Sequence, residues 1–130
     1  MESKDKKEKK MPARQITVKI GQNDYEIKFP RNGALIDIES AKIRMTGGTN
    51  KEFVYGGPSA QNAYLLVEAI ATFETLLPQM TKDLVVGSLL DLDQLQTKTV
   101  LKAYERYYQW MQEWRMFLND DIEEKKEGDA

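Results

Sequence analysis

The sequence predicts an α+β fold in which an N-terminal β-hairpin packs on a small helical domain of three to four helices. Three observations lead to this prediction. Apolar and polar residues alternate in two short runs between residues 15 and 30, which is the period of half-buried strands. Residues 63–77 are almost all apolar, and residues 96–119 carry apolar side chains at helical spacing.

Opposite charges gather at the two ends of the chain. Residues 1–14 hold six basic and three acidic residues, and residues 119–130 hold six acidic residues and two lysines. Both ends are too polar to join a core, so we expect a disordered basic tail and a disordered acidic tail. Residues 15–118 remain as a single globular domain of near-neutral charge, which argues against nucleic-acid binding.

The hairpin is expected over residues 15–30. Its two strands would place one set of apolar side chains on a common face, namely Ile16, Val18, Ile20, Tyr25, Ile27 and Phe29. Residues 21–24 supply turn chemistry, and Pro30 ends the ladder because proline has no backbone N–H to donate. An isolated hairpin is marginal in water. It must therefore pack on the helices, add to another sheet or pair with a second copy.

A first helix is expected near residues 34–46. Apolar side chains recur on one face at Ala34, Ile38, Ala41 and Met45. Lys42 and Arg44 near its end complement the helix dipole. Gly47 follows directly, as is common after the last helical turn.

The connection over residues 46–58 places glycine pairs on both sides of Phe53, Val54 and Tyr55. We expect these three residues to form a short third strand or a clamp that orders on assembly. Core packing of Phe53 or Tyr55 is the plainer alternative. Long connections are often functional, so Phe53 and Tyr55 are candidate partner-binding residues.

The second helix, near residues 59–77, is the most apolar segment of the chain. Ser59 suits its N-cap, and Pro78 disfavours helical geometry at the residue before it. Its main apolar face would hold Leu66, Ile70, Phe73 and Leu77. Only a narrow polar line could face water, formed by Glu68, Thr72 and Thr75. A helix this apolar must be covered on most sides by its own chain or by another subunit.

Between residues 79 and 95 the pattern indicates a short helical turn broken near Gly87 and Ser88. Asp91, Asp93 and Gln94 superficially suggest a calcium loop. The spacing lacks the glycine and the distal glutamate that such a loop requires. Helix capping is the expected role of these side chains.

The last helix is expected near residues 96–119. Its apolar seam has the alternating spacing of a heptad pattern, at Val100, Tyr104, Tyr107, Met111, Trp114 and Leu118. Large aromatic side chains and Met are enriched at interface cores. The candidate partner-binding residues here are Tyr107, Trp110, Met111, Trp114 and Phe117. Packing of this stripe on the helix near 59–77 is the alternative.

The composition argues against an enzyme. The chain has no Cys and no His, which removes thiolate chemistry, the commonest general base and the commonest metal ligand. Glu68 is the first candidate for a perturbed carboxylate, and Asp37 and Glu39 follow. None has a suitable catalytic partner nearby in sequence. We predict no catalytic, cofactor-binding or metal-binding residues.

No membrane or secretion signal is expected. The charged N-terminus lacks a following apolar core, unlike a secretory signal. The apolar run at 63–77 is shorter than the about 20 residues that span a bilayer.

Several short motifs carry a resemblance to a known class of protein. They are Phe29-Pro30, Ile36-Asp37-Ile38-Glu39-Ser40 with Lys42, Thr46-Gly47-Gly48, Ala69-Ile70-Ala71 with Phe73, Leu77-Pro78, Lys82-Asp83-Leu84 and Leu101-Lys102-Ala103-Tyr104. Over residues 15–118 the chain resembles small virion proteins of tailed phages, particularly those of gut Bacteroidetes. Its outline is similar to the phage tail assembly chaperones. The matching motifs are structural, and no site residue is carried over.

The resemblance implies a non-enzymatic role in virion or tail assembly. Partners would be other phage proteins, such as the tape-measure protein or tail-tube subunits, and the protein would be a homo-oligomer. It would act in the host cytoplasm during assembly, with retention in the virion left open. Two alternatives remain: a nucleic-acid-associated accessory protein that uses the arm at residues 1–14, and a phage inhibitor of a host protein.

Overall fold

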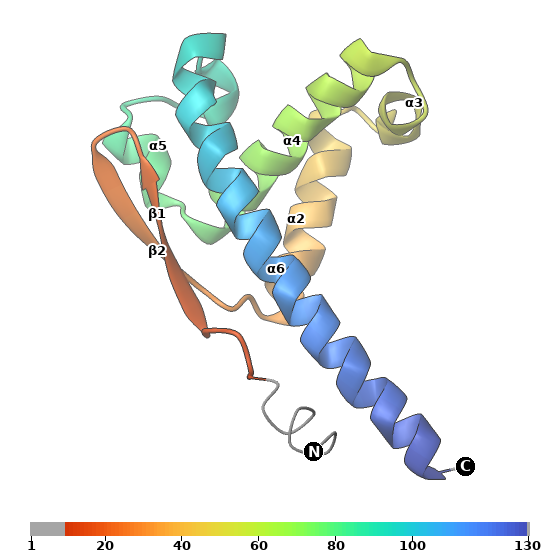
Figure 1. The fold of residues 1–130 in the computed structure, drawn as a ribbon. Helices are drawn as coiled ribbons and strands as arrows, with labels where there is room; N and C mark the ends of the chain where they lie inside the picture. Colours follow the sequence, from red (N-terminus) through yellow and green to blue (C-terminus); the bar gives the residue numbers. More distant parts are fainter. Residues whose placement is uncertain (1–9, 130) are drawn as a thin grey trace.

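A computed structural model describes the backbone of residues 10–129 and the side chains of residues 10–119. The α+β prediction is confirmed: a two-stranded antiparallel hairpin precedes a set of helices (Figure 1). The elements in order are β1 (Gln15–Ile20), β2 (Asn23–Lys28), α2 (Asn32–Met45), α3 (Asn50–Val54), α4 (Pro58–Leu76), α5 (Gln79–Asp83), the short 3₁₀ helix η1 (Leu89–Asp91) and α6 (Gln94–Asp129).

The hairpin has the predicted inner face, and its turn is shorter than the predicted residues 21–24, since β2 already begins at Asn23. Gln15 pairs with Lys28 at its open end, and Ile20 pairs with Asn23 at its closed end. Gly21 adopts a φ of 63° in the two-residue loop, a conformation that glycine reaches without steric cost. The inward side chains of Val18, Ile20, Tyr25 and Ile27 are buried. Of the three expected ways to cover this face, the structure uses packing on the helices.

Helix α6 lies between the hairpin on one side and α4 on the other (Figure 1). The core where these elements meet also receives side chains from α5 and η1. Its largest fully buried side chains are Val18, Ile20, Ile27, Phe73, Met80, Leu89 and Val100. Burying a large aliphatic or aromatic side chain contributes roughly 1.5–3 kcal/mol. Removal of this shared apolar surface from water is therefore what holds the hairpin to the helices.

Helix α2 packs on the far side of α4, through a smaller cluster of Ile38, Ala41 and Ala71. The small alanines allow the two helices to approach closely. The predicted glycine stop is confirmed: the N–H of Gly47 bonds to the carbonyl of Arg44 (3.2 Å), and the N–H of Gly48 bonds to that of Ile43 (2.9 Å). These two bonds are the pattern of a Schellman motif, which satisfies the last carbonyls of α2.

Two details of α4 differ from the sequence prediction. Its N-cap is Gly57, with Pro58 as the first helical residue, so the expectation of Ser59 as N-cap was wrong; proline suits this first position because its φ is already helical. Thr72 was expected to face water but is buried. Its hydroxyl donates to the carbonyl oxygen of Glu68 at 2.7 Å, so burial leaves no unpaired polar atom.

The connection between α2 and α4 contains the short helix α3, not a third strand. The strand prediction for Phe53, Val54 and Tyr55 was therefore wrong. The five residues of α3 form about one and a half helical turns, which need only local hydrogen bonds. A third strand would instead need an open edge of the hairpin within reach. Helix α3 instead packs against α4, where Gln61 donates to the carbonyl of Gly56 at 3.1 Å.

The segment between α4 and α6 is held by carboxylates that cap helix ends. Glu74 accepts hydrogen bonds from the hydroxyl of Ser88 and the N–H of Leu89, both at 2.7 Å. Asp91 closes a capping box with Ser88 at the start of η1. Asp93 accepts from the N–H of Gln96 at 2.8 Å, and the Gln96 side chain accepts from the N–H of Asp93 at 3.0 Å. The capping prediction is thus confirmed for Asp91 and Asp93.

Helix α6 is longer than predicted. The predicted helix ended at Asn119 and was followed by a disordered acidic tail, whereas the backbone of α6 remains helical to Asp129. The C-terminal part extends beyond the other elements (Figure 1). Of the expected disordered basic tail, residues 1–9 lie outside the described residues, and residues 10–13 have no regular secondary structure.

Candidate functional site

Three of the residues predicted to contact a partner are internal. Tyr107, Trp110 and Trp114 are 6%, 5% and 2% exposed. Their rings belong to the core that α6 forms with the hairpin and α4. In this fold their apolar surface is covered by the chain itself, which favours the alternative of core packing for these three residues.

The two indoles fasten the N-terminal segment to α6. Both Trp110 and Trp114 donate their ring N–H to the carbonyl oxygen of Ala13, at 2.8 and 3.1 Å. Phe29 stacks on Trp114 with ring centroids 4.0 Å apart and meets Trp110 edge-on at 6.1 Å. The guanidinium of Arg14 lies 5.8 Å from the ring centroids of Phe29 and Trp114. The aromatic load of α6 thus closes the open end of the hairpin.

The other predicted residues are more accessible. Met111 and Phe117 are half-buried against the same core. Phe53 is half-buried, and Tyr55 is 85% exposed, which excludes core packing for Tyr55. The structure does not bring Phe53 and Tyr55 together with the α6 residues, because α3 contacts α4 at the opposite end of the helical layer from the hairpin (Figure 1).

A groove of about 730 Å³ between α4 and α6 is open to a partner. We call it the α4–α6 groove. Its lining is Leu65, Glu68, Lys98, Leu101, Lys102, Tyr104, Glu105 and Tyr108. Leu65 is 43% exposed and Tyr108 50% exposed, so both sides of the groove present apolar surface to solvent.

Two walls of different origin form this groove. Leu65 and Glu68 come from α4, three residues apart on one face. The α6 wall combines the apolar side chains of Leu101, Tyr104 and Tyr108, spaced three and four residues apart. Tyr104 belongs to the predicted apolar seam, but this second stripe was not predicted from the sequence. The residue that could have indicated this stripe is Tyr108, an aromatic residue outside the seam and four positions, about one helical turn, after Tyr104.

Charged side chains surround the apolar floor of the groove. Glu68 also lies 3.5 Å from the ammonium of Lys42, which pairs with Glu39 at 2.7 Å and lies 5.6 Å from the Tyr64 ring centroid. Burial lowers the pKa of Lys42, but the hydrogen bond and charge of Glu39 outweigh it, so the pKa is raised. Burial, followed by the nearby charge of Glu68, raises the pKa of Tyr104.

Of the three carboxylates considered as catalytic candidates, two serve structure. Glu68 and Glu39 share Lys42, and Asp37 is exposed on α2. Within residues 10–119 no cluster of three acidic side chains is arranged to hold a metal ion. The arrangement around the groove suits binding: apolar surface flanked by both signs of charge.

Fold and groove together define an α+β protein with an accessible apolar groove between two helices. Comparison with family models, with curated proteins and with solved structures found no match to this chain. None of its described helices combines the length and hydropathy needed to cross a bilayer.

Proposed function

We propose that the protein is a non-enzymatic component of tailed-phage assembly that acts through protein–protein contacts. Its partners would be the tape-measure protein or tail-tube subunits, met in the host cytoplasm, and it would itself form a homo-oligomer. The resemblance of residues 15–118 to small virion proteins supplies the context. The observation that supports a binding role is the exposed apolar lining of the α4–α6 groove.

The groove suits a helix of the partner. Its α6 wall runs from Lys98 to Tyr108, a rise of about 15 Å or three helical turns. A partner helix with apolar residues three and four apart would fill the floor between Leu65 and Tyr108. Acidic positions beside that stripe would face Lys98 and Lys102, and basic positions would face Glu68 and Glu105.

The test uses purified proteins encoded by the neighbouring virion genes, titrated one at a time into this protein by calorimetry. We expect at least one to bind. Tyr108→Ala should weaken binding about 10- to 100-fold, the range for an aromatic residue central to an interface. Because Tyr108 is half exposed, the variant should unfold at nearly the same urea concentration as the wild type.

Met116→Ala is the matched control, since Met116 is an exposed apolar residue on α6 outside the groove. It should bind as the wild type does. The proposal fails if no neighbouring gene product binds, or if both variants lose the same affinity. Light scattering at several concentrations tests the homo-oligomer, and a monomer mass throughout would contradict it.

A further inference from the structure

The outer edge of β1 offers unpaired backbone groups. The N–H of Phe29 bonds to the carbonyl of Arg14 at 2.7 Å, so residues 14 and 29 form a hydrogen-bonded pair. Such pairs alternate with non-bonded pairs along an antiparallel ladder. Given the register, Gln15, Thr17 and Lys19 therefore direct their backbone N–H and C=O groups away from β2.

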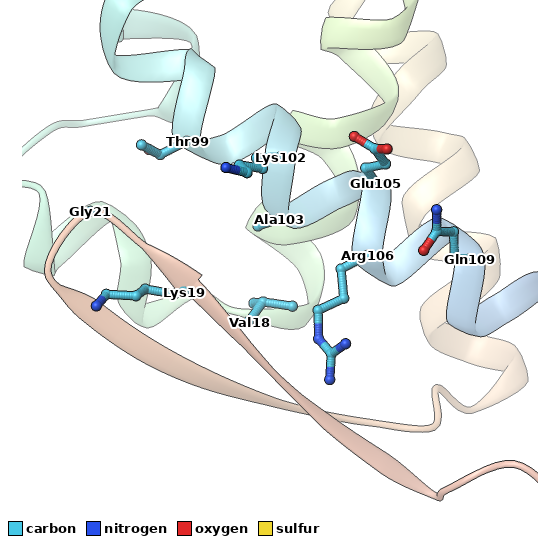
Figure 2. Close-up of a pocket in the computed structure, with 9 residues that line it drawn as sticks. All are labelled: Val18, Lys19, Gly21, Thr99, Lys102, Ala103, Glu105, Arg106 and Gln109. Carbon is cyan, nitrogen blue, oxygen red and sulfur yellow. The ribbon is translucent and has the colours of Figure 1, made fainter.

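A second groove runs beside this edge, and we call it the β1–α6 groove (Figure 2). It has a volume of about 600 Å³. Its lining is Val18, Lys19, Gly21, Thr99, Lys102, Ala103, Glu105, Arg106 and Gln109. The α6 wall from Thr99 to Gln109 rises about 15 Å, which matches four to five residues of extended chain.

Positive charge dominates the part of the groove that faces the strand. Figure 2 shows the side chain of Arg106 reaching toward β1, whereas the carboxylate of Glu105 points away from the hairpin. The Nε of Arg106 donates to the carbonyl oxygen of Thr17 at 3.0 Å. Lys19 and Lys102 supply two further cations at the same groove. Arg106 thus occupies one acceptor of an otherwise open strand edge.

We propose that the β1–α6 groove binds an extended, acidic segment of a partner protein, which adds as a third strand to β1. The segment's N–H would replace Arg106 at the Thr17 carbonyl, and the released guanidinium would pair with a carboxylate of the segment. Side chains alternate across a strand, so acidic residues would face the cations while apolar ones would contact Val18 and Ala103. A second copy paired through the same edge is disfavoured, because it would bring two Arg106 side chains together.

This site adjoins the α4–α6 groove and shares Lys102 and Glu105 with it. Its strand edge and Arg106 lie outside that groove, so the proposal does not depend on the function proposed above. A nucleic-acid strand could also meet the three cations, but it would leave the backbone donors and acceptors of the edge without matching partners. The alternative of a guarded edge, where Arg106 and Lys19 only prevent aggregation, is an outcome of the test.

The probe is a short synthetic peptide in which glutamate alternates with valine, titrated into the full-length protein and followed by backbone amide NMR. We expect shifts at Thr17, Lys19 and Lys102. A peptide with lysine in place of glutamate should cause none. Thr17→Pro should weaken binding about tenfold, the loss of one edge hydrogen bond.

Glu26→Pro is the matched control. Glu26 is paired with Thr17 and directs its own N–H to the opposite edge of the hairpin, so its proline variant should keep the affinity for the acidic peptide. If either proline variant unfolds, Lys102→Glu and Arg106→Glu replace them, since both side chains are exposed. Each should abolish binding of the acidic peptide, while Tyr108→Ala should not affect it.

Three results would overturn the proposal. If no amide shifts appear up to millimolar peptide, Arg106 and Lys19 only protect the strand edge from aggregation. Equal binding of the acidic and lysine peptides would show apolar adhesion without charge recognition. Tighter binding of a short oligothymidylate to the same residues would make the groove a nucleic-acid site.

Discussion

At the scale of single residues, one carbonyl oxygen allows both tryptophan side chains to be buried. The carbonyl of Ala13 accepts both indole N–H groups, from Trp110 and Trp114. Each indole can therefore be buried without leaving an unpaired donor. Aromatic residues on a helix indicate an interface only when no other segment of the same chain packs on them. Here Phe29 already stacks on Trp114.

Burial of Tyr107 makes the protein sensitive to alkaline pH. Burial raises the pKa of Tyr107 to about 12, and the charge of Arg115 opposes this only in part. The unfolded chain releases the phenol proton at about pH 10, which the folded chain does not. The free energy of unfolding should therefore fall as pH rises from about 10 to 12, by up to about 1.4 kcal/mol per pH unit for this group.

Urea unfolding at a series of pH values measures this effect. Tyr25 and Tyr104 also have raised pKa values because of burial, so they contribute to the same loss. Tyr107→Phe should reduce the slope above pH 10 and change stability by less than about 1 kcal/mol at pH 8. An unchanged slope in this variant would show that Tyr107 titrates normally.

At the scale of elements, α6 uses different faces for the core, for the α4–α6 groove and for the β1–α6 groove. One side buries Val100, Tyr107 and Trp114 against the hairpin and the core. The flanking residues line the α4–α6 groove on one side and the β1–α6 groove on the other, with Lys102 and Glu105 common to both. Both proposed docking surfaces therefore depend on the position of this one helix.

The start of α6 should be sensitive to Asp93. Its carboxylate caps the N–H of Gln96 at 2.8 Å, and Gln96 returns a bond to the N–H of Asp93. Asp93→Ala should lower the free energy of unfolding by about 1 kcal/mol. Asp93→Asn should retain most of it, because the amide oxygen still accepts the bond. Equal losses in urea unfolding would show that the accepted hydrogen bond is not what stabilises this end of α6.

Element prediction succeeded where periodicity was strong. The alternation of residues 15–30 and the apolar run of 63–77 gave the hairpin and α4 nearly to their observed bounds. The third strand over residues 53–55 was wrong, since three apolar residues between glycines fit a helical turn as well as a strand. The predicted end of α6 was wrong because the charged segment after Asn119 lacks the apolar stripe by which a helix is recognised in a sequence.

At the scale of the whole molecule, the hairpin is joined to the last helix across nearly the full length of the chain. The bonds from Trp110 and Trp114 to Ala13 span 97 and 101 residues. At its closed end, the hydroxyl of Tyr25 donates to Asp83 of α5 at 2.8 Å. The hairpin is thus tied at both ends to helices that come much later in the sequence.

Two N-terminal deletions should measure how much the indole bonds to Ala13 contribute to the free energy of unfolding. Removing residues 1–13 takes away the acceptor of both indoles, whereas removing residues 1–9 leaves it in place. We expect the longer deletion to be less stable, by about 1–3 kcal/mol for each indole donor left unpaired. Urea unfolding of the two proteins measures the difference. Equal stability would show that water replaces Ala13 without cost.

By itself, the sequence determined the fold class, the inner face of the hairpin and the capping roles of Asp91 and Asp93, because these follow from local periodicity and short-range hydrogen bonds. Only the tertiary structure decided which apolar side chains remain accessible. Trp110 and Trp114 are covered at the open end of the hairpin and Tyr107 meets Phe73 of α4. Leu65 and Tyr108 are left at the α4–α6 groove. Helical spacing states which residues share a face, but burial depends on which distant segment covers that face.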